Sequence, residues 1–116
     1  MRQVKVKIVA ALKASVGLAG VKITPAWPKS STDYPCIAYY SAGIAAEIAD
    51  GRTIGVNGIM RFDCFAATLS KVEDMADEAL KVMDVLGHYL ATSMDVPDSD
   101  PAIYHKVLEF RVIERL

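Results

Sequence analysis

The side chains best suited to acid–base chemistry in this chain are its two histidines, His88 and His105. A catalytic histidine needs a nucleophile to activate and a third group to orient its ring. His88 falls on the polar side of an expected helix and His105 at the start of an expected strand, and no serine or cysteine stands in a nucleophile motif. The pattern favours two solvated histidines over a catalytic pair, so we expect no catalytic residue.

The two cysteines, Cys36 and Cys64, fall on different expected strands and show neither CxxC nor metal-ligand spacing. We expect two reduced, buried thiols, as in a cytosolic protein. A disulfide between them is the alternative, and it requires the two strands to be neighbours.

Two further patterns suggest ligands but lack the necessary context. Asp95, Asp98 and Asp100 resemble a cation loop, yet the EF-hand order with its distant glutamate is absent, which favours a solvated turn. Gly55 to Gly58 has the GxxG spacing of a nucleic-acid clamp, but it lies inside an expected strand. We therefore expect no metal and no cofactor.

Trp27 is the remaining side chain of interest, because it lies between Pro25 and Pro28 in a loop. Aromatic residues dominate binding hot spots, so Trp27 is a candidate partner surface. A ring folded over the edge of the core is the alternative.

The elements that position these residues follow from a change of hydrophobic period near Thr68. Between positions 59 and 66, Met60, Phe62 and Cys64 alternate with Arg61 and Asp63, as in a half-buried strand. From position 72 onward the apolar residues recur at helical steps and form one stripe. Its members are Val72, Met75, Ala76, Ala79, Met83, Leu86 and Leu90. A second alternating run closes the chain at positions 106–114.

The start of the long helix has a sequence signal, since Ser70 with Glu73 three positions later forms a capping box. We expect this helix to end near Ser93. Residues 3–17 fit either a strand or a helix, and their alanine-rich centre favours helix. Short strands are expected at 21–24, 36–40 and 44–49. Asp50-Gly51 then permits a tight type I′ turn into a strand over 52–66, with a bulge or bend at its glycines.

These elements predict a single α+β domain over residues 1–116, in the order α-β-β-β-β-α-β. We expect an antiparallel sheet of about four strands with a long protruding hairpin, packed against two helices. The composition fits a folded chain, with 53% hydrophobic and 23% charged residues. We expect mature structure at the N-terminus, because Lys13 interrupts the apolar run too early for a secretory signal, and no run approaches a membrane span.

The charge is unevenly distributed along the chain. Residues 1–58 hold seven basic and three acidic residues, a net of +4, and residues 59–116 hold six and eleven, a net of −5. The overall charge of −1 argues against nucleic-acid binding, which depends on clustered Lys and Arg. The basic segment with Lys5 and Lys13 and the acidic helix with Asp77 and Asp84 are instead candidates for complementary interface patches.

The order of motifs resembles the tail-completion, or tail-terminator, proteins of long-tailed phages and prophages. The resemblance rests on the Y-P-C-I-A-Y-Y strand after a proline-rich loop, on Asp50-Gly51, on R-F-D-C-F, on the acidic helix and on the closing strand, and it covers most of the chain. It implies a self-assembled ring, commonly a hexamer, that caps the tail tube at its head-proximal end and meets the head connector. Its partners would be the tail tube and head–tail connector proteins, first in the host cytoplasm and then in the virion tail. The matching positions Pro35, Ile37, Tyr39, Asp50 and Gly51 would determine the fold.

We therefore expect a structural assembly protein and not an enzyme. The alternative is a small ferredoxin-like α+β domain that binds a metabolite or has a regulatory role. The hairpin strands hold more apolar surface than a free ribbon can leave in water. We expect Ile44, Ile48, Ile54 and Val56 to pack against a neighbouring subunit.

Overall fold

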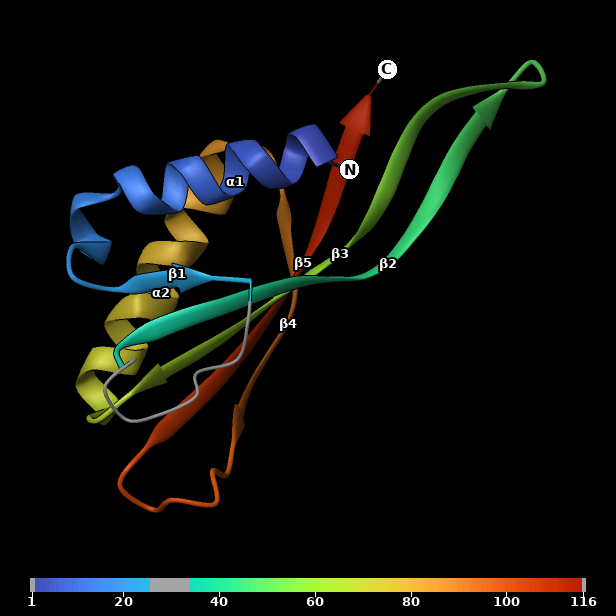
Figure 1. Ribbon diagram of the computed structural model, residues 1–116. Helices are drawn as coiled ribbons and strands as arrows, with labels where there is room; N and C mark the ends of the chain where they lie inside the picture. The colour runs from blue at the N-terminus through green and yellow to red at the C-terminus, as the bar shows by residue number, and fades with distance from the viewer. Residues whose placement is uncertain (1, 26–33, 116) are drawn as a thin grey trace.

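The computed structural model describes residues 2–25 and 34–115, with the backbone alone at positions 2, 42, 44, 56 and 115. Two helices and a five-stranded sheet of order β1-β2-β3-β5-β4 make up the fold (Figure 1). The expectation of one α+β domain is confirmed at this level. The sheet has one strand more than the roughly four expected, and the element order differs near the C-terminus.

The first helix, α1 (Arg2–Ala14), settles the ambiguity of residues 3–17. Val4, Ile8 and Leu12 are buried, at steps of four, whereas Val6 is exposed. A strand would instead bury Val4, Val6 and Ile8 together, so this pattern is that of a helix. A 3₁₀ turn, η1 (Val16–Leu18), follows, and Gly20 takes the left-handed conformation with φ of 79°.

The strands β2 (Cys36–Ala49) and β3 (Arg52–Ala66) form one long antiparallel hairpin. Asp50 and Gly51 have φ of 53° and 73°, which confirms the expected type I′ turn. We expected separate strands at 36–40 and 44–49, but they are one strand, because the irregularity between Ser41 and Gly43 is a β-bulge and not a break. The second bulge sits opposite Glu47, next to Gly55.

The second helix, α2 (Leu69–Val85), has its N-cap two residues before the expected N-cap at Ser70. Thr68 is the N-cap, and its Oγ1 accepts a hydrogen bond from the Lys71 backbone N–H at 3.1 Å. The expected stripe packs inward, since Val72, Met75, Ala76, Ala79 and Met83 are all buried. The Thr68 hydroxyl, one residue before the helix, therefore caps it in place of Ser70, which the capping-box pattern had predicted.

The end of α2 was placed wrongly, because the helix stops at Val85 and not near Ser93. Gly87 has φ of 84°, and its N–H bonds the Asp84 carbonyl while the His88 N–H bonds the Met83 carbonyl. These two bonds are the Schellman arrangement that ends helices at a glycine. Residues after it form β4 (Tyr89–Val96), a strand missing from the expected order.

The last strand, β5 (Tyr104–Arg115), lies between β3 and β4 and is antiparallel to both. The other edge carries β1 (Lys22–Thr24), which pairs in parallel with Cys36 to Ala38 of β2. The short strand expected at 21–24 is therefore present, but the sheet is mixed and not purely antiparallel. A strand of three residues is too short for its sequence pattern to predict whether it pairs in parallel or antiparallel.

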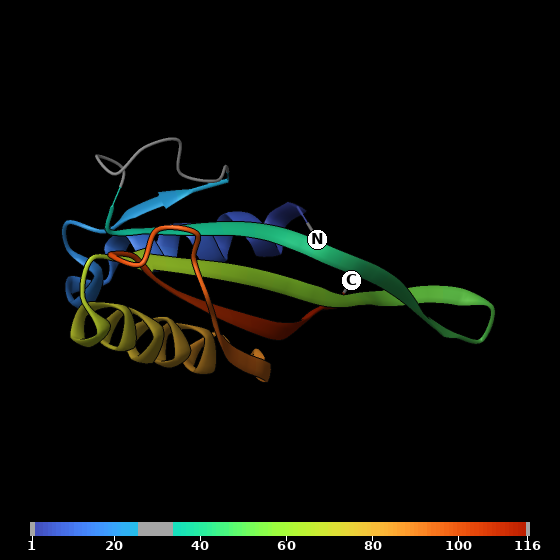
Figure 2. The same cartoon turned by 90° about the horizontal axis from the view of Figure 1, so that it is seen from below.

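Both helices cover the same face of the twisted sheet (Figure 2). The main core joins Ile8 and Leu12 of α1 and Met75 of α2 to alternate residues of the strands, among them Phe62 and Phe110, whose ring centroids are 5.2 Å apart. The opposite face holds a smaller cluster of Cys36, Ala38 and Phe65, with Tyr34 and Ile103 packed against it.

Candidate functional site

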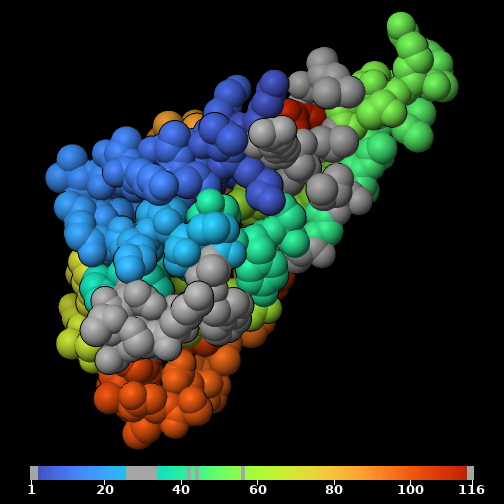
Figure 3. Space-filling view, viewed as in Figure 1, coloured from blue at the N-terminus to red at the C-terminus, as the bar shows by residue number. Residues whose placement is uncertain are grey.

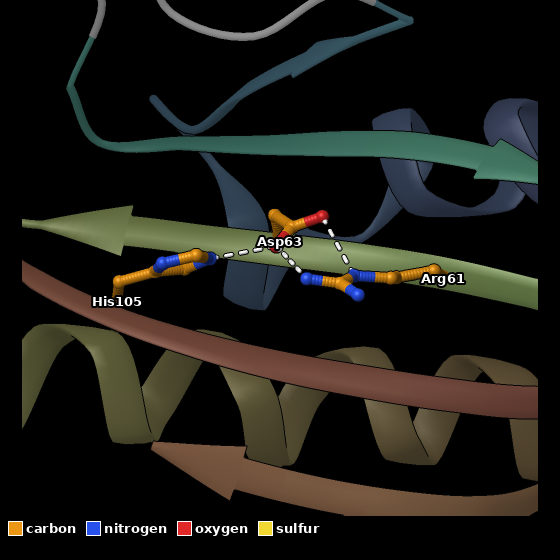
Figure 4. A network of polar contacts seen from close by, with 3 residues as sticks. All are labelled: Arg61, Asp63 and His105. Carbon is orange, nitrogen blue, oxygen red and sulfur yellow. Dashed lines mark hydrogen bonds and ion pairs between the residues drawn. The ribbon is translucent and has the colours of Figure 1, made fainter. Parts of the chain in front are cut away.

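A buried polar cluster lies on the face of the sheet opposite the helices. Asp63 on β3 is fully buried, and its Oδ1 lies 2.6 Å from His105 Nε2 on β5 (Figure 4). Arg61, two residues before Asp63 on the same face of β3, donates to both carboxylate oxygens, at 3.3 Å from Nε and 3.2 Å from Nη2. The carboxylate thus has a donor on each side.

These contacts determine the charge of Asp63. Burial alone would raise the pKa of the carboxyl group, but the hydrogen bonds from His105 and Arg61 and the charge of the guanidinium outweigh it, so the net pKa is lowered. The hydrogen bond to Asp63 is the main reason that the pKa of Arg61 is raised. Asp63 is therefore ionised at neutral pH, and because a carboxylate only accepts, His105 Nε2 carries the donated proton.

Aromatic rings enclose this cluster. The His105 ring stacks on the Phe65 ring with centroids 4.2 Å apart, and the Tyr34 ring also stacks on Phe65, at 5.8 Å. The Arg61 guanidinium lies 5.7 Å from the centroid of the Tyr40 ring, within cation–π range. The arrangement fastens β3 to β5 and to the start of β2, which makes it a structural clamp.

The expectation of two solvated histidines was wrong for both. His105 is buried in the clamp, and His88 is buried directly after the Schellman turn of α2. Burial lowers the pKa of His88, and its Nδ1 has no hydrogen-bond partner among the described residues. The misplaced end of α2 explains this error, since a residue on the polar side of a helix would have been solvated.

The two thiols are reduced and buried, as expected. Cys36 pairs with Phe65 across the β2–β3 ladder, and Cys64 pairs with Ile37, so the two side chains point to opposite faces of the sheet. The alternative disulfide is therefore wrong, although the strands are neighbours. Burial raises the pKa of Cys64 to about 12, which keeps this thiol protonated and unreactive at neutral pH.

The acidic loop is a set of turns, as expected. Asp98 Oδ1 accepts from the Asp100 N–H, and Asp100 Oδ1 accepts from the Ala102 N–H, both at 2.9 Å. Asp95 Oδ1 accepts from Lys106 Nζ at 3.3 Å. Within residues 2–25 and 34–115, no three His, Cys, Asp or Glu side chains are grouped so that they could hold a metal ion.

The residues predicted to form the oligomer interface lie on the distal part of the hairpin. Ile48 is 69% exposed and Ile54 is 41% exposed, on the part of the ribbon that extends beyond β5 (Figure 1). Ile44 pairs with Gly58 and Val56 with Ala46 along the same ribbon. Figure 3 shows this ribbon projecting from the body of the molecule. We refer to residues 43–58 as the arm.

The four predicted charged residues lie on the two helices. Lys13 on α1 and Asp77 and Asp84 on α2 are exposed, and Lys5 on α1 is half-buried. None of the four takes part in an ion pair with another described residue. They therefore stay available as candidate interface charges, and their role stays a prediction. The candidate partner residue Trp27 lies outside the described residues.

Sequence reasoning missed the clamp because alternation placed Asp63 on the solvent side of its strand. The missed feature at the other end of the sheet is β4, whose side chains are exposed on both faces. The described helices include none that is both long and apolar enough to cross a membrane.

Among the comparisons with known proteins, the one with solved structures gives matches. No family model and no curated protein matches the sequence. Among solved structures, a chain from the virion of a native gene transfer agent (GTA) particle has a similar fold, with a TM-score of 0.74 and 13% sequence identity. The match covers 94% of this chain and 92% of that chain. At this identity the likeness shows that the two chains share a fold over nearly their whole length.

Proposed function

We propose that this protein is a structural component of a phage or phage-like particle. The observation that carries the proposal is the fold shared with a virion chain over 94% of this chain and 92% of that chain. The motif order of the tail-terminator family points the same way. The protein assembles; it does not catalyse, and it needs no cofactor.

Its specific role in this proposal is to close the tail. Copies of the chain form a ring, most simply a hexamer, that caps the head-proximal end of the tail tube. One surface of the ring meets the tube protein and the other meets the head–tail connector. Assembly takes place in the host cytoplasm, and the finished ring stays in the virion tail.

The shape of the molecule supports a ring component. Its principal extents are 53 × 28 × 21 Å, and the arm accounts for much of the excess length (Figure 1). The pairing of β3 with β5 stops at Gly55, so the tip of the arm is a ribbon of two described strands, and it exposes Ile48 and Ile54. A two-stranded ribbon is marginally stable in water by itself. A neighbouring subunit that covers the arm would stabilise it and would remove this apolar surface from water.

The clamp supports the same role by fixing the base of the arm. Arg61 and Asp63 lie on β3 between the arm and the end of the strand, and His105 holds Asp63 to β5. A projecting arm transmits orientation to a neighbour only if its base is rigid. The buried ion pair network supplies that rigidity without exposing a reactive group.

Native mass spectrometry tests this proposal directly. We expect a closed homo-oligomer of the purified protein, or one that forms when a purified tail tube protein is added. Electron microscopy should then show the ring at one end of the tube only. A monomer that takes up a small metabolite and ignores tubes would contradict the proposal and support the ferredoxin-like alternative.

A further inference from the structure

The described sheet has two open edges, and one of them is β4. Its only described partner strand is β5, and seven of its eight residues are exposed. Tyr89 is 63% exposed, Leu90 40% and Met94 45%. A bulge between Leu90 and Thr92 interrupts the first part, which leaves Thr92 to Val96 as a regular strand. Such an edge presents unpaired backbone N–H and C=O groups that can template another strand.

The other open edge belongs to the arm. The parallel strand β1 covers β2 only from Cys36 to Ala38, so the outer edge of β2 has no described partner beyond Ala38. A bulge after Ser41 again interrupts the strand. From Gly43 to Ala49 no further residue is inserted in β2 itself, because the extra residue of the second bulge, opposite Glu47 and Ile48, is Ile54 on β3. This stretch of β2 is comparable in length to the regular part of β4.

Apart from these bulges, the two stretches lack the side chains that commonly protect a strand edge against pairing. Proteins guard edges with Lys or Pro, or by covering them, and neither residue type occurs in Gly43 to Ala49 or Thr92 to Val96. Each stretch has one carboxylate, and each is engaged within its own sheet. Asn57 Nδ2 donates to Glu47 at 3.4 Å, and Lys106 donates to Asp95 at 3.3 Å. The acidic charges therefore do not stand free against an incoming strand.

The directions of the two edges are compatible between copies. Because β2 is antiparallel to β3, β3 to β5 and β5 to β4, β4 runs opposite to β2. The two edges lie on opposite sides of one sheet with β3 and β5 between them, so a single copy cannot join them. A second copy placed alongside, with its helices on the same side, would bring its β2 antiparallel to the first copy's β4.

We propose that copies of this chain assemble by pairing the outer edge of β2, from Gly43 to Ala49, with Thr92 to Val96 of β4 in the next copy. This inference rests on the proposed function and names the interface of its ring. The contact joins two different surfaces, so the same contact can repeat from each copy to the next. The chain of copies closes into a ring when the rotation between neighbouring copies is a whole fraction of a full turn. The strand β1 limits the pairing to the arm, because it already occupies the edge at Cys36 to Ala38. The arm would then extend the neighbour's sheet by β-strand addition.

Engineered cysteines test the contact. A chain with Ser93→Cys and a second cysteine at Ala45 or Ala46 should form covalent dimers and higher ladders on oxidation, because facing side chains of antiparallel strands have Cβ atoms about 5 Å apart. The two native cysteines are buried, so the wild-type chain gives the background. Ser93→Cys with Lys13→Cys on α1 is the matched control and should stay at that background.

Proline substitution provides a second, independent test. Successive N–H groups of a strand point to opposite sides, so of Ser93→Pro and Met94→Pro one removes an N–H directed to β5 and the other an N–H directed outward. The variant with the higher melting temperature of the two identifies the outward position, because it keeps the β4–β5 ladder intact. That variant should be monomeric where the wild type is a ring.

The outcomes separate this inference from the proposed function. A wild-type ring that caps tubes but shows neither the β2–β4 cross-link nor sensitivity to the outward proline would overturn the edge pairing alone. Self-linking of the single Ser93→Cys variant as a dimer would show two-fold pairing of β4 and would also overturn it. A wild type that stays monomeric with tube protein present would overturn both.

Discussion

Asp63 and His105 are 42 residues apart in the sequence, yet they form a buried hydrogen bond of 2.6 Å that fastens the base of the arm to β5. Arg61 donates to the same carboxylate, so three charged or ionisable groups share one site on the face of the sheet that carries no described helix. Groups of this kind are tolerated in an interior only when each is paired.

Removal of the shared acceptor should therefore strongly destabilise the fold. We expect Asp63→Ala to lower the free energy of unfolding by about 3–5 kcal/mol, because His105 and Arg61 both lose their partner. Urea denaturation followed by circular dichroism measures this. Asp77→Ala, at an exposed position on α2, is the control and should change stability by less than about 0.5 kcal/mol. Similar effects of the two substitutions would show that the clamp is not stabilising.

His88 should make the stability depend on pH. Its pKa in the folded protein lies below the ordinary value of 6.5 because burial disfavours the charged ring. Between these two values the unfolded chain binds more protons than the folded one, so stability falls as pH falls below about 6.5. Lys7 and Glu114 are the charged residues that line the same cavity as His88.

The comparison of urea midpoints at pH 7.5 and 5.5 tests this dependence. Wild type should lose more stability between these values than His88→Asn, which cannot titrate. An equal loss in both proteins would assign the acid sensitivity to other groups.

Gly87 should be difficult to replace although it has space around it. A Cβ there would meet no atom within 4 Å, but the φ of 84° is unfavourable for any other residue. We expect Gly87→Ala to cost about 1–2 kcal/mol. Gly43→Ala is the matched control, because it also has free space and does not have a positive φ. Thermal unfolding of both variants tests this prediction. Equal falls in the two melting temperatures would contradict it.

The charges on the helices provide a test of assembly that leaves the monomer intact. Lys5→Glu with Lys13→Glu should weaken association, and the further changes Asp77→Lys with Asp84→Lys should partly restore it. The effect should fade with added salt, since the Debye length is about 8–10 Å in ordinary buffers. Sedimentation velocity at two ionic strengths measures it. An unchanged oligomer for the Lys-to-Glu pair at both ionic strengths would show that these charges do not close the ring, which leaves the arm or an apolar patch as the interface.

Deletion of the distal arm should separate folding from assembly. A chain in which Ala46 to Ile54 is replaced by a short turn should remain a folded monomer, because the main core does not include this segment. Size-exclusion chromatography with light scattering would show the loss of the oligomer. Retention of the full oligomer would exclude the arm as an interface.

Periodicity predicted the parts of the fold that are amphipathic over several turns or residues. The stripe from Val72 to Met83 is confirmed, because it buries one clear face. The strand around Phe62 is also confirmed, but residues 62–66 are buried on both faces, whereas the alternation had led us to expect burial on one. The errors follow from local chemistry that outweighs such a pattern. Leu90 continues the helical stripe in sequence, but the left-handed Gly87 has already ended the helix, so Leu90 lies on a strand.

The clamp was beyond this reasoning for a different reason. A strand pattern says which residues share a face, and Asp63 does lie opposite Phe62 and Cys64 as expected. The strand pattern does not say that the second face is also covered, or that His105 lies beside Asp63. That requires the register of β3 with β5, in which Asp63 pairs with Val107 and Phe65 with His105. The available clue was Arg61, two residues before Asp63 and therefore on the same face of the strand.

The two-residue turn at Asp50-Gly51 also has a consequence for the order of folding. It keeps the β2–β3 pairs closer in sequence than the β3–β5 pairs: the widest β2–β3 pair is Cys36 with Phe65, whereas the β3–β5 ladder joins Gly55 to Arg115 and cannot form until β5 has been synthesised. Local contacts form first because they close the shortest loops. During synthesis the hairpin therefore exists before β5 does, and the inner edge of β3 stays open for that interval. Nascent chains of this protein are most vulnerable to mispairing with one another just before their last twelve-residue strand is released.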